Sequence, residues 1–256
     1  MTSPRSFYDS LDSARWGRQE LKGQRAITER WAAQVTVKGP SIELGCGVGA
    51  LAGCKPWQVG IDLSFVALRD SRGPRVQSYM ERLPFADNTF SFLFSWAAIE
   101  HVPQPELVFA EILRVVRPGG IALLAPAWHC RPWAAEGLAF RPYRDLRPGQ
   151  RLRKALIPLR NSILWRGAFE LPRRLGREVR ARYRVPELEY ERLQPNLDEF
   201  LGTDSDAFTS LDPHAAILFF AKRGWDVLSH ARPRARMLAR HEPVVVRKPE
   251  SKPESA

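Results

Sequence analysis

Short apolar runs separated by glycine, proline and charged residues occupy the middle of the chain, and they predict strands. Each run is four to seven residues long, and they lie at residues 41–44, 58–61, 76–79, 90–96 and 121–125. Before the last run, apolar residues recur at helical spacing over residues 107–116, and the sequence RPGG at 117–120 predicts a helix end followed by a turn. Strands alternating with helices predict a parallel sheet in an α/β fold.

Apolar and charged residues also mix at helical spacing on both sides of these runs. Residues 7–35 predict one or two short helices that cover the core. Residues 171–183 carry an apolar residue at every fourth position with arginines between them, which predicts a basic amphipathic helix whose apolar stripe needs a partner. Asp212 and Pro213 predict the start of a helix that ends near Gly224.

Two more apolar runs, at 225–228 and 244–246, predict the final strands of the sheet. We therefore expect five segments along the chain. These are a helical cover (1–36), an α/β core (37–130), a basic helical insertion (131–200), the last helix and strands (201–248), and a disordered tail (249–256).

The composition limits the class of protein. A chain of 256 residues with 44% apolar residues can bury one sizeable core. Its longest apolar stretches fall short of the roughly 20 residues that span a bilayer, and the charged N-terminus lacks the apolar run of a secretory signal. We expect a cytoplasmic protein. Cys46, Cys54 and Cys130 are odd in number and lack zinc-site spacing, so we expect reduced thiols and no metal site.

The positive charge is concentrated in one segment. Lysine and arginine exceed aspartate and glutamate by 11 over the whole chain, and residues 131–184 alone hold fifteen of the basic residues against four acidic ones. Such a segment suits nucleic acid, an anionic membrane surface or an anionic substrate, and it also suits a purely solubilising face.

The first strand and the loop after it carry the densest chemical signal. Gly45, Gly47 and Gly49 follow the strand, where glycines allow a tight turn and close approach of a ligand. Asp62 ends the next strand, where a carboxylate can accept hydrogen bonds from ribose hydroxyls. Both halves of a nucleoside site are present, although Gly45, Gly47 and Ala50 also satisfy the GxGxxA pattern of dinucleotide-binding dehydrogenases. Asp62 also suits a simple helix cap before Ser64.

Glu43 helps to separate these two possibilities. An acid within a buried strand costs several kcal/mol unless a positive partner compensates it. S-adenosylmethionine carries an ammonium and a sulfonium, whereas the pyrophosphate of a dinucleotide would repel this carboxylate. The sign of the ligand charge favours the methyl donor, and the alternative is that Glu43 pairs with a core arginine or orders a loop.

Together these motifs resemble the class I methyltransferase family, and especially its broad group of quinone and small-molecule methylases. The resemblance covers about residues 40–128 and rests on the order of the glycine motif, Asp62, the sequence ERLPFAD at 81–87, EHV at 100–102 and RPGG at 117–120. It implies a Rossmann-like, seven-stranded, mostly parallel sheet with helices on both faces, and S-adenosylmethionine as cofactor.

The resemblance also implies roles for individual residues. Gly45, Gly47 and Gly49 would line the methionine and ribose of the donor, Glu43 would lie beside its amino group, and Asp62 would hold the ribose hydroxyls. The predicted donor site is completed by Cys46, Leu63, Tyr79, Met80, Glu81 and Trp96.

Two departures from the family pattern stand out. Tyr79 occupies the position where members commonly carry an acid that binds the adenine amino group, so adenine would instead stack or bond through the backbone. The distance from Gly49 to Asp62 leaves room for only about two helical turns, where members often have a longer helix. These departures keep open a noncatalytic protein with a methyltransferase fold.

The acceptor is less clearly marked. His101 and His129 follow the fourth and fifth strands, whose carboxyl ends face the ligand crevice, so either can serve as a general base for a hydroxyl acceptor. The plainer alternatives are a helix-capping His101 and a solvent-exposed His129. Asp204 and Asp206 suit a polar acceptor or a solvated loop.

The basic insertion predicts the chemistry of the partner. We expect a small-molecule, sugar or lipid-linked acceptor that is anionic, with peripheral contact to an anionic membrane through residues 151–184. RNA methylation is the alternative, because aromatic residues accompany the arginines, although no RNA-binding module is recognisable. A nicotinamide oxidoreductase is the third alternative.

Overall fold

The computed structural model describes residues 3–11, 21–202 and 204–250. Its main feature is a seven-stranded sheet in the order β3-β2-β1-β4-β5-β9-β8. The first five strands in this order are parallel, and β9 runs antiparallel to both of its neighbours. The predicted α/β fold with a mostly parallel seven-stranded sheet is confirmed.

The strands follow the apolar runs of the sequence. The sheet consists of β1 (Ser41–Leu44), β2 (Gln58–Asp62), β3 (Arg75–Gln77), β4 (Phe90–Trp96), β5 (Val116–Ala125), β8 (Asp226–Val227) and β9 (Val244–Arg247). The strands β1, β4 and β9 are almost continuously buried because helices cover both faces of the sheet.

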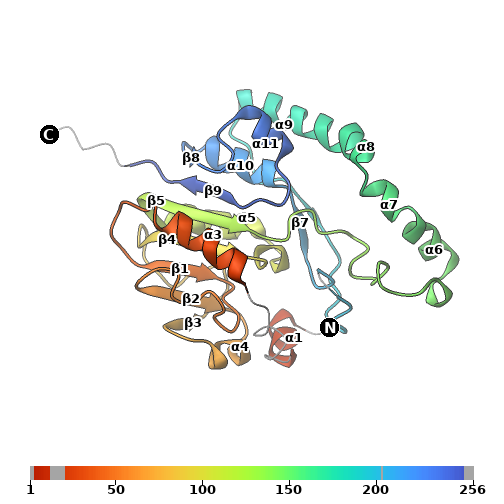
Figure 1. The fold of residues 1–256 in the computed structure, drawn as a ribbon, viewed down its shortest axis with the longest axis horizontal. Coiled ribbons are helices and arrows are strands. Elements are labelled where there is room, and N and C mark those ends of the chain that lie inside the picture. Colours follow the sequence, from red (N-terminus) through yellow and green to blue (C-terminus); the bar gives the residue numbers. More distant parts are fainter. Residues whose placement is uncertain (1–2, 12–20, 203, 251–256) are drawn as a thin grey trace.

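Alternate residues of the central strands divide the core into two layers. On one face, Leu93 of β4 and Ile42 and Leu44 of β1 pack with α5 (Pro105–Val115) and α10 (Pro213–Ala221). On the other, Phe92 and Phe94 stack at 5.5 Å and pack with α3 (Lys22–Ala32). Figure 1 shows the sheet between these helices.

The segments before and between the strands complete this core. The short α1 (Pro4–Ser10) lies near α4 (Phe65–Asp70), and the 3-10 turn η1 (Ile99–His101) follows β4. A second 3-10 turn, η2 (Tyr143–Asp145), precedes the basic helices, and α11 (Pro233–Leu238) lies beside α10. The antiparallel pair β6 (Tyr190–Arg192) and β7 (Thr209–Leu211) forms a separate small sheet.

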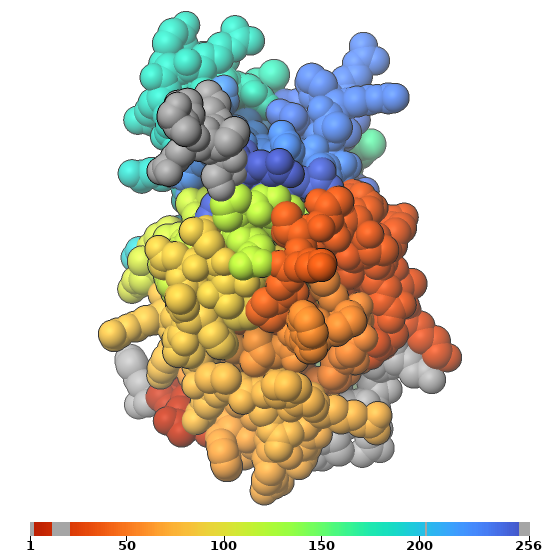
Figure 2. All heavy atoms as spheres, turned by 90° about the vertical axis from the view of Figure 1, so that its left-hand side faces the viewer, coloured from red at the N-terminus to blue at the C-terminus, as the bar shows by residue number. Residues whose placement is uncertain are grey.

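A run of helices, here called the arm, extends along one edge of the molecule. It comprises α6 (Pro148–Ala155), α7 (Ile157–Arg160), α8 (Ile163–Trp165), the π-helical turn η3 (Arg166–Glu170) and α9 (Leu171–Tyr183). In Figure 1 the arm curves away from the sheet, and only α9 returns to α10 and α11. Figure 2 shows the teal end of the arm above the orange and yellow body that contains β2, α4 and the segment before β4.

Several sequence predictions need correction. The strand expected at 76–79 is β3, one residue earlier and one shorter, and the strand expected at 225–228 retains only Asp226 and Val227. The turn expected at 117–120 lies inside β5, as an irregular stretch in which Gly119 has a φ of 76° and its N–H bonds to the carbonyl of Lys248.

The ends of the chain also differ in part from expectation. Lys248 is anchored, since its Nζ donates to Asn88 and to the carbonyls of Leu113 and Val116. Residues 251–256 of the expected tail, and residues 12–20 of the expected cover, lie outside the described residues. Among the described helices, none combines the length and the apolar content that crossing a bilayer requires.

Candidate functional site

The loop after β1 is folded as tightly as its glycines predict. Gly45, Gly47 and Gly49 have φ values of 74°, 49° and 75°, a region that side chains other than hydrogen disfavour. A Cβ on Gly45 would lie 2.3 Å from the Cβ of Ala98, whereas a Cβ on Gly47 would meet no atom within 4 Å. The loop is therefore pressed against the end of β4 and has open space over Gly47, where a ligand can approach the backbone.

The segment between this loop and β2 contains turns and no helix. Successive turns are closed by bonds from the N–H of Gly49 to Cys46, from Ala52 to Gly49 and from Cys54 to Leu51. The segment between Gly49 and β2, which is long enough for about two helical turns, therefore forms a compact loop in place of a helix.

Asp62, the last residue of β2, holds this loop in place. Its Oδ2 accepts the N–H of Gly47 at 2.8 Å and its Oδ1 accepts the N–H of Ser64 at 2.9 Å. Burial raises the pKa of Asp62, and the backbone hydrogen bonds act against this rise. Since each carboxylate oxygen has a second lone pair, Asp62 retains the capacity to accept ribose hydroxyls. The cap of α4 is Ser64 itself, whose Oγ accepts the N–H of Ala67.

Glu43 is a buried acid without a direct cationic partner among the described residues. Its side chain lies on the α3 face of the sheet and its Oε2 accepts from Nε2 of Gln58 at 3.0 Å. Gln58 also donates to the carbonyl of Leu51, so the pair helps to order the loop. Burial, followed by the nearby Asp62 carboxylate, raises the pKa of Glu43 to about 8. A ligand that carries an ammonium would reverse this rise.

Other residues of the predicted donor site lie around the glycine loop. Cys46 is buried, and its Sγ lies 2.7 Å from a Cβ built on Gly60, so loop and strand are in close contact. Met80 lies beside Gly45, since its Cε is 3.0 Å from the position of a Cβ there. The carbonyl of Leu63 accepts from Nε2 of Gln77, which joins the ends of β2 and β3.

The remaining donor-site predictions are more peripheral. Tyr79 is 57% exposed, so its side chain is accessible to a ligand. Burial raises the pKa of Glu81. The indole Nε1 of Trp96 donates to Oγ1 of Thr28 at 3.0 Å, which ties the end of β4 to α3. Among the described residues, none of these three forms a hydrogen bond or ion pair with Asp62 or Glu43.

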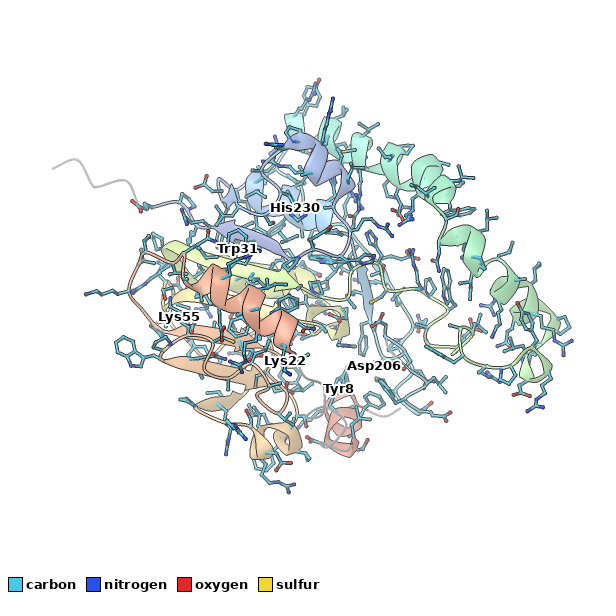
Figure 3. The ribbon with its side chains drawn as sticks, viewed as in Figure 1. Tyr8, Lys22, Trp31, Lys55, Asp206 and His230 are labelled. Atoms are coloured by element: carbon cyan, nitrogen blue, oxygen red, sulfur yellow. The ribbon has the colours of Figure 1, made fainter. Side chains whose placement is uncertain are left out.

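A second cluster of polar side chains lies next to Gly45, because Ala98 leads directly into η1. His101 is part of this cluster, with its Nδ1 3.3 Å from Oδ2 of Asp206 and its Nε2 3.7 Å from Oε1 of Glu100. The hydroxyl of Tyr8, on α1, donates to Oδ2 of Asp206 at 2.9 Å. Figure 3 shows Tyr8 beside Asp206. We name Tyr8, Glu100, His101 and Asp206 the polar cluster.

The polar cluster is almost removed from solvent. Glu100 is 0% exposed, its Oε1 accepts the N–H of Ala127, and its Oε2 has no hydrogen-bond partner in the described part of the chain. Burial lowers the pKa of His101, but Glu100 and Asp206 outweigh it and the net shift is upward. This arrangement stabilises an imidazolium, which is what a general base becomes after it accepts a proton.

Helices from the N-terminal part of the chain cover both groups of residues. Asp9, next to Tyr8 on α1, accepts from the Oγ of Ser64 at 2.8 Å and from the N–H of Val66. On α3, Nη2 of Arg25 donates to the carbonyls of Ala50 and Ala52 in the glycine-containing loop. The cover expected from the sequence is thus bonded to the loop and to the residues after Asp62.

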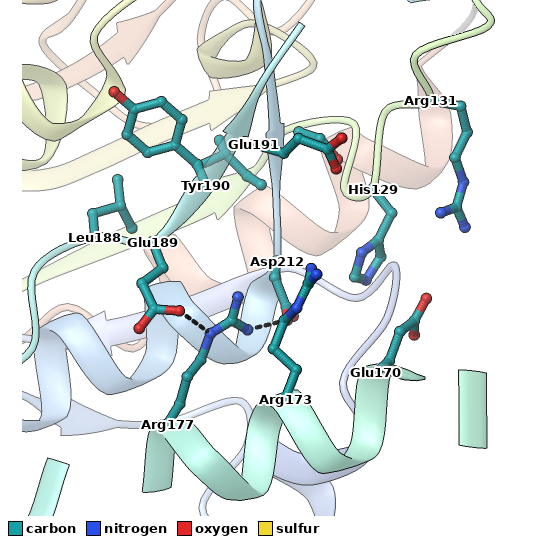
Figure 4. Close-up of a pocket in the computed structure, with 12 residues that line it drawn as sticks. His129, Arg131, Glu170, Arg173, Arg177, Leu188, Glu189, Tyr190, Glu191 and Asp212 are labelled. Carbon is teal, nitrogen blue, oxygen red and sulfur yellow. Dashed lines mark hydrogen bonds and ion pairs between the residues drawn. The ribbon is translucent and has the colours of Figure 1, made fainter. Parts of the chain in front are cut away.

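His129 lies apart from the polar cluster, in a different cavity. The cavity has a volume of about 560 Å³ and its lining includes Arg131, Arg173, Arg177 and Asp212. Figure 4 shows Arg177 between Glu189 and Asp212, with His129 and Arg131 on the other side. Burial lowers the pKa of His129 to about 4, against the effect of Asp212. His129 is half-buried, which differs from the solvent-exposed position that the sequence left open. Its lowered pKa keeps the imidazole neutral near pH 7.

Sequence reasoning missed Tyr8 and the inward position of Asp206. Tyr8 and Asp206 are 198 residues apart, and no spacing rule connects them. The burial of Glu100 also went unnoticed, although an acid directly after an apolar strand is the same kind of signal that Glu43 gave. Cys46, Cys54 and Cys130 are free and buried, in agreement with the expectation of reduced thiols.

Comparisons with known proteins fit this geometry. Residues 42–124 match the family model described as a methyltransferase domain. A sterol 24-C-methyltransferase of Schizosaccharomyces pombe is 31% identical over 96 residues, which cover 31% of this chain and 25% of that protein. An uncharacterized methyltransferase of Mycobacteroides abscessus is 34% identical over 76 residues, which cover 30% of this chain and 29% of that protein.

The chain spans under a third of the length of these curated relatives, so their acceptors are properties of those proteins. Among solved structures, a Methanococcus maripaludis protein assigned as an S-adenosyl-L-methionine-dependent methyltransferase is 12% identical. It aligns over 99% of both chains with a TM-score of 0.48. Residues 42–124 thus match a methyltransferase domain, and over this region the chain is similar to S-adenosylmethionine-dependent methyltransferases of class I.

Proposed function

We propose that the protein transfers the methyl group of S-adenosylmethionine to a hydroxyl of a small acceptor. The observation that carries this proposal is the bond between the N–H of Gly47 and the carboxylate of Asp62, with Glu43 buried below the same loop. An open glycine backbone, a carboxylate that can accept hydroxyls and a buried acid without an ion pair are thus linked to the same loop, which is what a nucleoside with an ammonium requires.

The residues of this site fit the charge and shape of the donor. Asp62 would accept the ribose hydroxyls, and the open backbone at Gly47 would lie under the ribose and methionine. Glu43 would compensate the ammonium, directly or through water. The half-exposed ring of Tyr79 offers a stacking surface for adenine in place of the acid common in the family. When bound, the donor supplies an electrophilic methyl group on its sulfonium.

The polar cluster supports a role for His101 as general base. Its imidazole would accept the proton of the acceptor hydroxyl as the methyl group is transferred. Asp206, 3.3 Å from Nδ1, would stabilise the imidazolium by its charge, and Tyr8 would fix Asp206 by its hydrogen bond. In-line transfer needs alignment above all, so these residues would also position the acceptor.

We extend the proposal to an anionic acceptor of small-molecule, sugar or lipid-linked type, which two arginines of the cavity beside His129 favour and its carboxylates Glu170 and Glu191 oppose. Its volume of about 560 Å³ lies within the range of small-molecule sites. Arg174 and Arg177 share the carboxylate of Asp212, and Arg177 also pairs with Glu189, whereas Arg131 and Arg173 have no ion pair among the described residues. Two such guanidinium groups can bind a phosphate or carboxylate. The neutral His129 would then donate or accept a hydrogen bond and would not act as a base.

The donor proposal is tested by calorimetry with S-adenosylmethionine and with NAD. We expect micromolar binding of S-adenosylmethionine, and a loss of at least about tenfold in Asp62→Asn, because one lost charge-assisted hydrogen bond costs about 1.5 to 3 kcal/mol. The exposed Glu199→Gln is the control and should bind as the wild type does. Tighter binding of NAD, or full donor binding by Asp62→Asn, would contradict the proposal.

The base proposal is tested on acceptors once turnover is found. His101→Gln should lower kcat by about 100-fold or more while donor affinity stays unchanged. The activity of Tyr8→Phe should fall less, because it loses only the bond that positions Asp206. If His101→Gln turned over at the wild-type rate, catalysis would rest on alignment alone.

A further inference from the structure

The arm is attached to the body by its charged side. Arg174 and Arg177 of α9 are only 3% and 8% exposed, and both pair with Asp212, the N-cap of α10. Arg177 also pairs with Glu189 at 2.8 Å, and Nη1 of Arg174 donates to the carbonyl of Met237. Figure 4 shows α9 with Arg177 directed toward Glu189 and Asp212. These contacts fix the rotation of α9 about its own axis.

This rotation turns the apolar stripe of α9 to the outside. Leu175, Val179 and Tyr183 recur every four residues and are 54%, 53% and 85% exposed. With about 100° per residue, they lie on the side of the helix away from Arg177 and Ala181, which face the body. The partner that the sequence demands for this stripe is therefore absent from the described part of the chain.

The same polarity continues through the rest of the arm. Leu152, Leu156, Leu159 and Ile163 follow one another at spacings of four, three and four residues, and their exposed fractions are 63%, 39%, 50% and 76%. Leu164 is 77% exposed. Figure 1 shows α6, α7 and α8 along the outer edge of the molecule, away from the sheet. A row of exposed aliphatic side chains at helical spacing is unusual for a surface that faces only water.

The charge of the arm indicates what lies opposite this surface. Residues 148–184 contain eleven lysines or arginines against two glutamates. Arg182 borders the apolar stripe of α9 and Arg184 follows at the end of the helix, and both are exposed and have no ion pair among the described residues, whereas Arg180 pairs with Glu189. An apolar stripe bordered by cations is the pattern of a helix that lies in the interface of an anionic membrane.

We infer that the outer face of the arm docks on the surface of an anionic lipid bilayer. The aliphatic side chains enter the boundary between headgroups and acyl chains, and the flanking arginines pair with anionic headgroups. RNA would satisfy the arginines but not this row of leucine and isoleucine side chains, which cannot stack with bases. A second copy of the chain would bring one strongly positive face against another.

The apolar half of the inference is tested by flotation with vesicles of phosphatidylcholine and phosphatidylglycerol. Ile163→Ser combined with Leu164→Ser should lower the partition coefficient by about tenfold or more, since two large aliphatic side chains no longer enter the membrane. Both side chains are exposed, so the melting temperature should not change. The matched control is Trp57→Ser, because Trp57 is 78% exposed and lies outside the arm, just before β2. It should bind vesicles as the wild type does.

The charged half is tested with Arg182→Gln combined with Arg184→Gln, two exposed arginines that form no ion pair with the described residues. Binding to the anionic vesicles should fall by about tenfold or more, following the contribution of about 1 kcal/mol per basic residue. Binding to pure phosphatidylcholine should be weak in every variant, and high salt should weaken wild-type binding. Arg30→Gln combined with Arg69→Gln removes the same charge outside the arm and should have little effect.

Three results would overturn the inference. The first is unchanged vesicle binding by the Ile163 and Leu164 variant. The second is a concentration-dependent dimer that this variant dissociates, together with no vesicle binding by the wild type. The third is binding of transfer RNA that the arginine variant abolishes while vesicles are not bound at all. Because vesicle binding needs neither donor nor acceptor, its outcome is independent of methyl transfer.

Discussion

The sheet and the arm place their apolar residues in opposite directions. In the sheet, Phe92 and Phe94 are 0% exposed. In the arm, Arg174 is 3% exposed while Ile163 is 76% exposed. Both regions have clear apolar periodicity. Periodicity therefore shows that an element has an apolar face, but it does not show whether that face is buried in the protein or exposed on its surface. The orientation of the apolar face depends on the residues that contact the element. Helices cover the apolar faces of the sheet, whereas Asp212 binds the arginines of α9 and leaves its apolar side outside.

The largest expected effect comes from truncating one apolar side chain in each region and comparing the losses of stability. Phe94→Ala should lower the free energy of unfolding by about 4 kcal/mol, because it leaves a cavity in a closed core. Ile163→Ala should change it by less than about 0.5 kcal/mol, since the side chain is already in water. Urea denaturation of both variants makes the comparison. Equal losses would show that the arm is packed more tightly than its exposure indicates.

The next effect concerns the charges that hold the arm. Asp212→Asn retains an oxygen to cap α10 but removes the charge that Arg174 and Arg177 share, at a cost of about 3 kcal/mol, because the buried Arg174 is left without an ion pair and Arg177 keeps only Glu189. We expect faster proteolysis within residues 166–184, measured by mass spectrometry. The control is Asp198→Asn, an exposed acid in the loop between β6 and β7. Unchanged cleavage in Asp212→Asn would mean that packing, and not charge, sets the orientation of α9.

A smaller effect is expected in the pH dependence of the free energy of unfolding, because His129 lies in the cavity between the arm and the core. The folded-state pKa of His129 is about 4, below about 6.5 in an unfolded chain. Between these values the unfolded chain binds more protons, so the contribution of His129 to stability is present above pH 6.5 and is lost as the pH falls toward 4. His129→Gln should remove about 1 to 3 kcal/mol of this dependence. Thermal or urea unfolding from pH 7 to 4 measures it, and parallel curves for both proteins would contradict the assignment.

The smallest effect concerns the predicted donor site and is the number of protons released when the donor binds. The pKa of Glu43 is raised to about 8, so the folded protein without a cation holds this proton at pH 7, and its burial contributes less to stability as the pH rises from about 4.5 to 8. An ammonium placed beside it should lower this pKa and release close to one proton. Calorimetry in buffers with different ionisation enthalpies measures the release. Glu43→Gln should abolish it, and release of the same size in this variant would assign the proton to another group.

The elements that sequence predicts well are those whose partners are nearby or numerous. The strands β1 and β4 and the helix α10 are continuous apolar runs with glycine, proline or a capping Asp212 at their ends, so local rules suffice. The contact between Asp62 and the glycine loop is also predictable from local rules, because the loop follows β1 and Asp62 ends the adjacent parallel strand β2.

Other features depend on contacts that no local rule describes. The bond between Tyr8 and Asp206 joins the first helix to a loop near the end of the chain, and the small sheet of β6 and β7 brings Glu189 to Arg177. The outward rotation of α9 follows from such contacts. A sequence indicates charges and periodicity there, but the pairing is decided by the positions of distant segments.

The burial of all three cysteines has a practical consequence for spectroscopy. Burial raises the pKa of the Cys46, Cys54 and Cys130 thiols, so thiolate, the form that reacts with maleimides, is scarce on the native protein near neutral pH. A new thiol introduced as Ile163→Cys would thus be labelled selectively in the otherwise natural sequence. An environment-sensitive dye at that position can report the depth and the timing of contact with a bilayer.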